Sequence, residues 1–122
     1  MAEEQVRVLV VDDASDSAEA MAILLRLNGY EVRTCTDSTE ALVAIGQRKP
    51  HCVLFDVVMP GMGGDELCSR LRELYGDDIV LIAVSGYAAG DPRVQTSFWL
   101  ADHYFTKPVD PAALSKLLRP VG

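Results

Sequence analysis

Four apolar runs in this chain each end in polar residues that could take part in chemistry. The runs and the residues that follow them are VRVLVV (6–11) with Asp12 and Asp13, CVLF (52–55) with Asp56, IVLIAV (79–84) with Ser85, and HYFT (103–106) with Lys107 and Pro108. Ligands of open parallel α/β sheets bind just outside the carboxyl ends of the strands. If these runs are strands of one sheet, three carboxylates, a hydroxyl and an ammonium group meet at one edge. That set suits one divalent cation and one phosphoryl group.

The three carboxylates point to a metal ion. Asp12, Asp13 and Asp56 would repel each other at close range unless a cation lies among them. Mg²⁺ is the natural candidate, because it takes oxygen ligands, keeps several waters and pairs with phosphate. The alternative is that Asp12 and Asp13 only cap the first helix, since acidic side chains favour helix N-termini. The placement of Asp56 at the end of a second strand favours the metal.

Asp56 could also act as a nucleophile. A carboxylate can attack phosphorus to give an acyl phosphate, and the glycine-rich loop after Asp56 predicts an exposed, approachable side chain. Lys107 and a bound Mg²⁺ would neutralise charge on the transferred group. Ser85 could donate a hydrogen bond to a phosphoryl oxygen, although an ordinary turn residue at a strand end would look the same.

Alternating strand and helix patterns must position these residues. Apolar runs alternate with helical periodicity along the whole chain, which is typical of βαβ units and a parallel sheet with helices on both faces. A strand is also expected at about 31–35. The expected helices are one ending near Asn28, one opened by Asp37 and Glu40, one over about 65–75 with Leu67, Leu71 and Leu74 facing inward, and two opened by Asp91-Pro92 and Asp110-Pro111. These elements fill residues 1–122 as a single domain.

Composition excludes several classes of protein. With 49% hydrophobic and 24% charged residues, the chain is globular rather than disordered. A net charge of −7 argues against a nucleic-acid surface. No apolar stretch approaches the ~20 residues that span a bilayer, and the first residues lack a signal peptide's pattern, so we expect a cytoplasmic protein. Cys35, Cys52 and Cys68 lack a CxxC spacing, which predicts buried, reduced thiols.

The chain resembles the receiver domain of two-component response regulators over essentially its whole length. The matching segments are LVVDD (9–13), FDVVMPGMGG (55–64), AVSG (83–86) and YFTKP (104–108). Each motif is weak alone, but four in this order at these separations are specific. The resemblance implies a doubly wound, flavodoxin-like (βα)5 sandwich with a parallel sheet of strand order 2-1-3-4-5.

The resemblance also implies a role for each residue of the site. Asp56 would accept a phosphoryl group from a phosphohistidine on a histidine kinase or a histidine phosphotransfer protein. Mg²⁺ would be bound by Asp13, Asp56 and the backbone carbonyl of Val58, with Asp12 acting partly through water. Lys107 would contact the phosphoryl group, and its peptide bond to Pro108 would be cis. Ser85 and Tyr104 would form a switch pair that changes the face made by helix four, strand five and helix five.

Several alternatives stay open at this stage. The protein would be a phosphoacceptor switch rather than an enzyme, working either as a stand-alone regulator or as the receiver of a hybrid kinase. A phosphatase with an aspartyl nucleophile on a similar sheet is the competing interpretation, although such enzymes resemble DxDx[TV] at the first strand. A flavodoxin-like FMN binder would need a phosphate-binding loop where Asp12 and Asp13 stand, and no GxGxxG or Walker loop is present. His51 and His103 fit strand starts better than a metal site.

Overall fold

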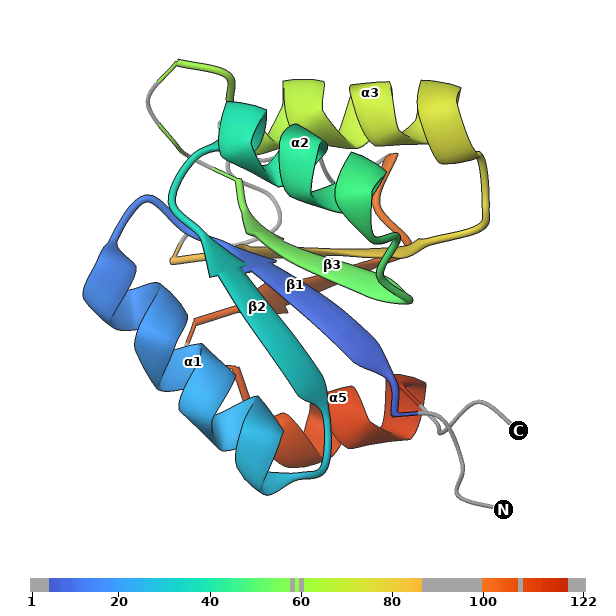
Figure 1. Ribbon diagram of the computed structural model, residues 1–122. Helices are drawn as coiled ribbons and strands as arrows, with labels where there is room; N and C mark the ends of the chain where they lie inside the picture. The colour runs from blue at the N-terminus through green and yellow to red at the C-terminus, as the bar shows by residue number, and fades with distance from the viewer. Residues whose placement is uncertain (1–4, 58, 60, 87–99, 108, 119–122) are drawn as a thin grey trace.

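Five parallel strands form one sheet in the order β2-β1-β3-β4-β5 (Figure 1). The computed structural model describes residues 5–57, 59, 61–86, 100–107 and 109–118. The strands are β1 (Arg7–Val11), β2 (Glu31–Cys35), β3 (Cys52–Asp56), β4 (Val80–Ser85) and β5 (His103–Thr106). All neighbouring strands pair in parallel. The structure therefore confirms the fold class and the strand order expected from the sequence.

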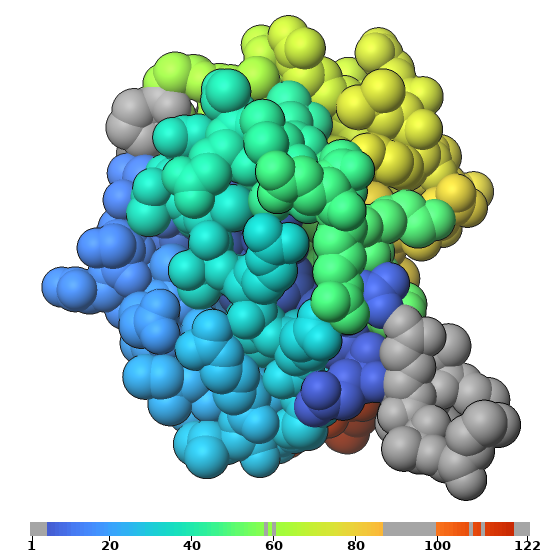
Figure 2. Space-filling model, in the orientation of Figure 1, coloured from blue at the N-terminus to red at the C-terminus, as the bar shows by residue number. Residues whose placement is uncertain are grey.

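Helices cover both faces of this sheet. They are α1 (Ser15–Leu27), α2 (Ser38–Gln47), α3 (Gly64–Tyr75) and α5 (Pro111–Leu117). Figure 1 shows α2 and α3 over one face and α1 and α5 over the other, and Figure 2 shows α1 and α2 on either side of β2. The helix expected to begin at Asp91-Pro92 lies outside the described residues. Within the described ranges, no helix is both long and apolar enough to span a bilayer.

Two of the predicted helix starts have the expected capping hydrogen bonds. The carboxylate of Asp37 accepts a 2.7 Å hydrogen bond from the backbone N–H of Glu40 at the start of α2. Asp110 accepts one of 2.9 Å from the N–H of Ala112, and Pro111 occupies the first position of α5. Each bond satisfies an N–H group that has no partner within the helix.

The core lies in two layers because successive side chains of a strand point to opposite faces. On β1, Leu9 and Val11 face α2 and α3, whereas Val8 and Val10 face α1 and α5. The three cysteines are buried and free, as predicted. Burial, reinforced by nearby carboxylates, raises the pKa of the Cys35 and Cys68 thiols to about 11. It also raises the pKa of Cys52, whose thiol is fully buried.

One prediction about the core was wrong. Leu74 was expected to face inward with Leu67 and Leu71, but its side chain is 65% exposed. The buried face of α3 instead follows Leu67, Cys68 and Leu71, and Tyr75 packs partly against the same cluster. Gly64, Cys68, Leu71 and Tyr75 follow the ordinary helical spacing of four and three residues, so Leu74 lies at the margin of this buried face.

Candidate metal and phosphoryl site

The three carboxylates meet at the carboxyl edge of the sheet. β1 and β3 are neighbouring strands, and Val11 pairs with Phe55. The residues that directly follow this pair, Asp12 and Asp56, therefore lie side by side. One oxygen from each of Asp12, Asp13 and Asp56 lies within 4.8 Å of the others. Asp12 is buried, Asp56 is partly buried and Asp13 is exposed. An all-oxygen set that keeps an open side fits Mg²⁺, which retains several waters when bound.

The structure does not use Asp12 to cap α1 in the ordinary way. The N-cap residue is Ala14, and no side-chain hydrogen bond caps this helix. Asp12 is held instead by its own backbone N–H, which donates to the carbonyl of Cys35 (3.1 Å), and by one carboxylate oxygen, which accepts from the N–H of Ala14 (3.0 Å). The second oxygen points into the site. Helix capping therefore does not account for the acidic pair.

Lys107 joins two of the carboxylates. Its ammonium nitrogen lies 3.1 Å from an oxygen of Asp12 and 3.1 Å from an oxygen of Asp56. Burial lowers the pKa of Lys107, but hydrogen bonds and charges of the two carboxylates outweigh that effect, and the net shift is upward. The backbone N–H of Lys107 donates to the carbonyl of Ser85 (2.7 Å), which fixes the start of the side chain. The ammonium is therefore charged at neutral pH and aimed at the site.

Asp56 is less accessible than its glycine-rich loop suggested. Its side chain is only 13% exposed, because Lys107 pairs with it and the loop returns closely over its backbone. The carboxylate nevertheless lines a cavity of about 390 Å³, together with Asp12 and Lys107. Apolar side chains of α1, including Met21 and Leu24, form part of the cavity wall. The Asp56 carboxylate therefore borders open space on the side of α1.

Two residues that shape the site were not identified from the sequence. A Cβ added at Gly64 would lie 2.6 Å from the carbonyl oxygen of Asp56 and 2.8 Å from the α-carbon of Val57, so only glycine fits there without movement. The hydroxyl of Ser38, which is 2% exposed, donates to the carbonyl of Met62 (2.8 Å) and anchors the loop after β3. The paired glycines 63 and 64 were a signal, but they were interpreted only as loop residues. The sequence around Ser38 contains no signal that would distinguish this serine from any other residue in the first turn of a helix.

Ser85 and Tyr104 lie on the same face of the sheet. β4 and β5 pair Ala83 with Tyr104 and Ser85 with Thr106, so the two residues are diagonal neighbours on adjacent strands. Ser85 is 1% exposed, and Tyr104 packs partly against the core layer beneath α2 and α3. The structure thus brings the predicted switch pair together. Val58 and Pro108 lie outside the described residues.

The histidines lie at strand starts, as expected. His51 directly precedes β3, and His103 is the first residue of β5. Both lie at the opposite edge of the sheet from the carboxylates. His51 accepts a hydrogen bond from the backbone N–H of Arg7 at its Nδ1 atom (2.8 Å), which is a structural contact.

Comparison with known proteins shows the family. Residues 8–119 match the sequence model of the response regulator receiver domain. The chain is similar to the response regulator MprA of Mycobacterium sp. (strain KMS), with 38% identity over 113 residues, covering 93% of this chain and 47% of the relative. The DNA-binding response regulator MtrA of Mycobacterium tuberculosis (strain ATCC 25618 / H37Rv) is 36% identical over 116 residues, covering 93% and 49%. The chain therefore spans about half the length of these relatives.

Solved structures agree with this assignment. A CheY-like receiver domain protein from Methanospirillum hungatei JF-1 has a TM-score of 0.83 and 31% identity, covering 93% of this chain and 90% of that one. TrrA from Thermotoga maritima, solved in complex with Mg²⁺ and BeF, has a TM-score of 0.78 and 29% identity, covering 91% and 94%. The chain belongs to the response regulator receiver domain family. It is a signalling switch of two-component systems with the phosphoacceptor role of that family.

Proposed function

We propose that Asp56 is the phosphoacceptor, and that it takes a phosphoryl group from a phosphohistidine on a histidine kinase or a histidine phosphotransfer protein. The main support is that Asp12, Asp13 and Asp56 offer oxygens within 4.8 Å of one another while Lys107 lies 3.1 Å from Asp56. A cluster of acidic oxygens and a fixed cation therefore lie beside one partly buried carboxylate.

In the proposed reaction, an Asp56 oxygen attacks phosphorus as the bond between phosphorus and the donor's imidazole nitrogen breaks. An acyl phosphate forms on Asp56, and the imidazole leaves with the electron pair of the broken bond. Lys107 moves from its pairing with the carboxylates to an oxygen of the transferred group, where its charge offsets the developing negative charge. Mg²⁺, bound by Asp12, Asp13, Asp56 and the carbonyl of Val58, would neutralise further phosphoryl charge.

The same proposal assigns the switch to Ser85 and Tyr104. The phosphoryl group adds about −1.5 to −2 charges near neutral pH, so the Ser85 hydroxyl would turn toward it as a donor. Tyr104, its diagonal neighbour, would then change its packing and alter the face that includes β5 and α5. The domain would then have two conformations, one with and one without this repacking. The phosphoryl group shifts the balance between them only if it stabilises one conformation more than the other. A downstream protein would recognise this face.

The wider setting of the chain is part of the proposal. The relatives are response regulators about twice as long as this chain, and it could serve as a stand-alone regulator or as the receiver of a hybrid kinase. MtrA is described as DNA-binding, but these 122 residues match only about half of it. The absence of a nucleic-acid surface on these residues stays a prediction, as does a cytoplasmic location.

Intact-protein mass spectrometry tests this function. With Mg²⁺ and acetyl phosphate, the wild type should gain one phosphoryl group, and Asp56→Asn should gain none. Asp65→Asn, which changes an exposed acid at the start of α3, is the matched control and should behave as the wild type. Labelling that persists in Asp56→Asn would refute the assignment. Repeated hydrolysis of many phosphomonoesters would instead support the phosphatase alternative.

A further inference from the structure

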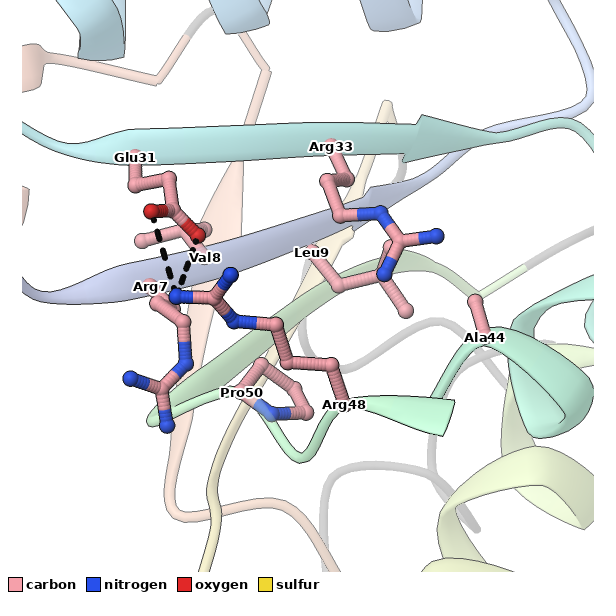
Figure 3. Close-up of a pocket in the computed structure, with 8 residues that line it drawn as sticks. All are labelled: Arg7, Val8, Leu9, Glu31, Arg33, Ala44, Arg48 and Pro50. Carbon is pink, nitrogen blue, oxygen red and sulfur yellow. Dashed lines mark hydrogen bonds and ion pairs between the residues drawn. The ribbon is translucent and has the colours of Figure 1, made fainter. Parts of the chain in front are cut away.

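A basic groove lies on the sheet face that carries α2, where that helix leaves part of the β2 edge strand uncovered. Its floor includes Leu9 of β1 and Ala44 of α2, and its rim carries Arg7, Arg33, Arg48 and Glu31 (Figure 3). In Figure 2, dark-blue atoms of β1 are visible between β2 and the C-terminal part of α2. Arg7 and Glu31 are the first residues of their strands, whereas Asp56 is the last residue of β3. The groove therefore starts at the amino ends of the strands, and Asp56 lies at the carboxyl ends.

This groove concentrates positive charge on an acidic protein. The chain has a net charge of −7, yet three of its eleven basic residues line the groove beside a single acid. Arg7 is oriented by hydrogen bonds of 3.2 and 2.9 Å from its guanidinium to the carbonyl of Lys49. Arg48 lies 3.3 Å from Glu31. Arg33 is exposed, and within the described ranges its guanidinium makes no hydrogen bond or ion pair.

A different arginine contacts the open backbone of the β2 edge strand. An edge strand needs charged or bulky groups to prevent pairing with other chains. The guanidinium of Arg26 in α1 donates a 3.0 Å hydrogen bond to the carbonyl of Val32 in β2. Arg33 and Arg48 lie on the face of the sheet that carries α2, away from that bond. Both side chains line the groove, with Arg48 turned toward Glu31 (Figure 3).

The shape of the groove limits what it can bind. The space it encloses is about 10 Å³, room for a single water at most. A small molecule could not be enclosed, so a ligand must lie across the surface and make several contacts. Guanidinium groups bind carboxylates through paired hydrogen bonds, so acidic side chains that lie across the rim would meet these arginines.

We propose that this groove binds an acidic, glutamate-rich segment of a protein partner, with carboxylates seated on Arg33 and Arg48. This inference goes beyond the phosphoacceptor function, because the groove and Asp56 lie at opposite edges of the sheet. A partner held here would leave the cavity beside Asp56 open. Binding should therefore be independent of phosphorylation.

Fluorescence anisotropy with two labelled hexapeptides, all-glutamate and all-glutamine, tests the proposal at low salt without Mg²⁺. The glutamate peptide should bind and the glutamine peptide should not. Changing Arg33→Gln and Arg48→Gln together should weaken binding by about tenfold or more, since two charge-assisted contacts are lost. Arg70→Gln is the matched control, because Arg70 pairs with Glu66 on the exposed face of α3 and should not affect binding.

Two further measurements keep the test decisive. Amide chemical shifts should change at residues 31–34 and not at residues 12, 13 and 56. Within the described residues Arg33→Gln removes no hydrogen bond or ion pair, so it should leave the melting temperature unchanged and still weaken binding. Equal binding of the two peptides, undiminished binding by the arginine variants, or full displacement of the glutamate peptide by an equal concentration of inorganic phosphate would each overturn the proposal.

Discussion

Gly64 packs against Asp56 so closely that a Cβ at position 64 would lie 2.6 Å from the Asp56 carbonyl oxygen. The contact is made by backbone, which cannot turn aside as the end of a long side chain could. The N–H of Gly64 also donates to the carbonyl of Val57 (3.0 Å), so the first turn of α3 is fastened to the end of β3. This packing sets where the proposed phosphoacceptor stands relative to α3.

We expect Gly64→Ala to destabilise the protein and to disturb Asp56 together. The added methyl group must displace backbone, and overpacking of this kind typically costs about 1–3 kcal/mol. Gly46→Ala is the matched control, because nothing lies within 4 Å of a Cβ there and the residue is in α2. It should stabilise the protein by about 0.5–1 kcal/mol. Urea unfolding and phosphorylation rates should be measured for both, and an unaffected Gly64→Ala protein would contradict the close packing.

Lys107 and Mg²⁺ should compete for the same oxygens. The ammonium lies 3.1 Å from both Asp12 and Asp56, where a bound cation would need to approach. Lys107→Met should therefore bind Mg²⁺ severalfold more tightly in calorimetric titration, yet accept phosphoryl groups much more slowly. Lys116→Met, in the last turn of α5, is the control and should change neither property. Unchanged Mg²⁺ affinity in Lys107→Met would show that the ammonium does not compete.

Lys107 should also produce a pH dependence of stability at alkaline pH. Its pKa in the folded protein is raised above the ordinary value of 10.5 by Asp12 and Asp56. Folding favours the charged form of Lys107. Its contribution to the free energy of unfolding is therefore complete below the ordinary pKa of 10.5 and is lost as the pH rises through the higher pKa of the folded protein. The difference in unfolding free energy between the wild type and Lys107→Met should therefore stay constant up to about pH 10 and narrow above it. A difference that narrows between pH 6 and 9 would assign the effect to another group.

Asp13 should contribute to the metal site without contributing to the core. It is exposed, whereas Asp12 is buried, so Asp13→Asn should leave the melting temperature without Mg²⁺ nearly unchanged. Its loss should weaken Mg²⁺ binding by at least about tenfold, because even the loss of a group that only orients a metal ligand commonly costs that much. Asp16→Asn, in the first turn of α1, carries the same charge change and should bind Mg²⁺ as the wild type. Equal Mg²⁺ affinities for the two variants would show that only general charge attracts the ion.

The cysteines should be unreactive in the folded protein. The thiolate is the reactive form, and burial raises the pKa of Cys35 and Cys68 to about 11. At about pH 8, Ellman's reagent should therefore modify none of the three thiols quickly, and all three after unfolding in guanidinium. Rapid labelling of one thiol in the native protein would indicate that its surroundings open more readily than the packing shows.

Much of the site could be predicted because strand ends are easy to locate in this sequence. Long apolar runs marked β1, β3 and β4, and parallel strands bring their carboxyl ends to one edge, so the meeting of Asp12, Asp56, Ser85 and Lys107 followed from topology alone. The capping acids Asp37 and Asp110 predicted two helix starts for an equally local reason.

Other features could not be predicted because they depend on contacts between distant segments. The low exposure of Asp56 comes from Lys107, 51 residues further along the chain, and from the return of the loop at Gly64. Helical periodicity from Leu67 and Leu71 placed Leu74 inside, but the buried face of α3 is centred between Leu71 and Tyr75, and periodicity alone does not fix that centre. The basic groove joins residues from β1, β2 and α2, and no local pattern marks it.

The last prediction concerns the coupling between Ser85 and Tyr104. Because they are diagonal neighbours on one face of the sheet, a hydroxyl that turns toward a phosphoryl group on Asp56 should change the packing of the tyrosine ring. Fluorotyrosine incorporation gives a ¹⁹F signal for each of the four tyrosines, and Tyr104→Phe identifies the relevant one. With Mg²⁺ and beryllofluoride, this signal should shift in the wild type and lose most of that shift in Ser85→Ala. Ser69→Ala, on α3, is the control and should retain the full shift. A full shift in Ser85→Ala would show that Tyr104 responds to phosphorylation without the serine, and the switch would then have to run through other residues.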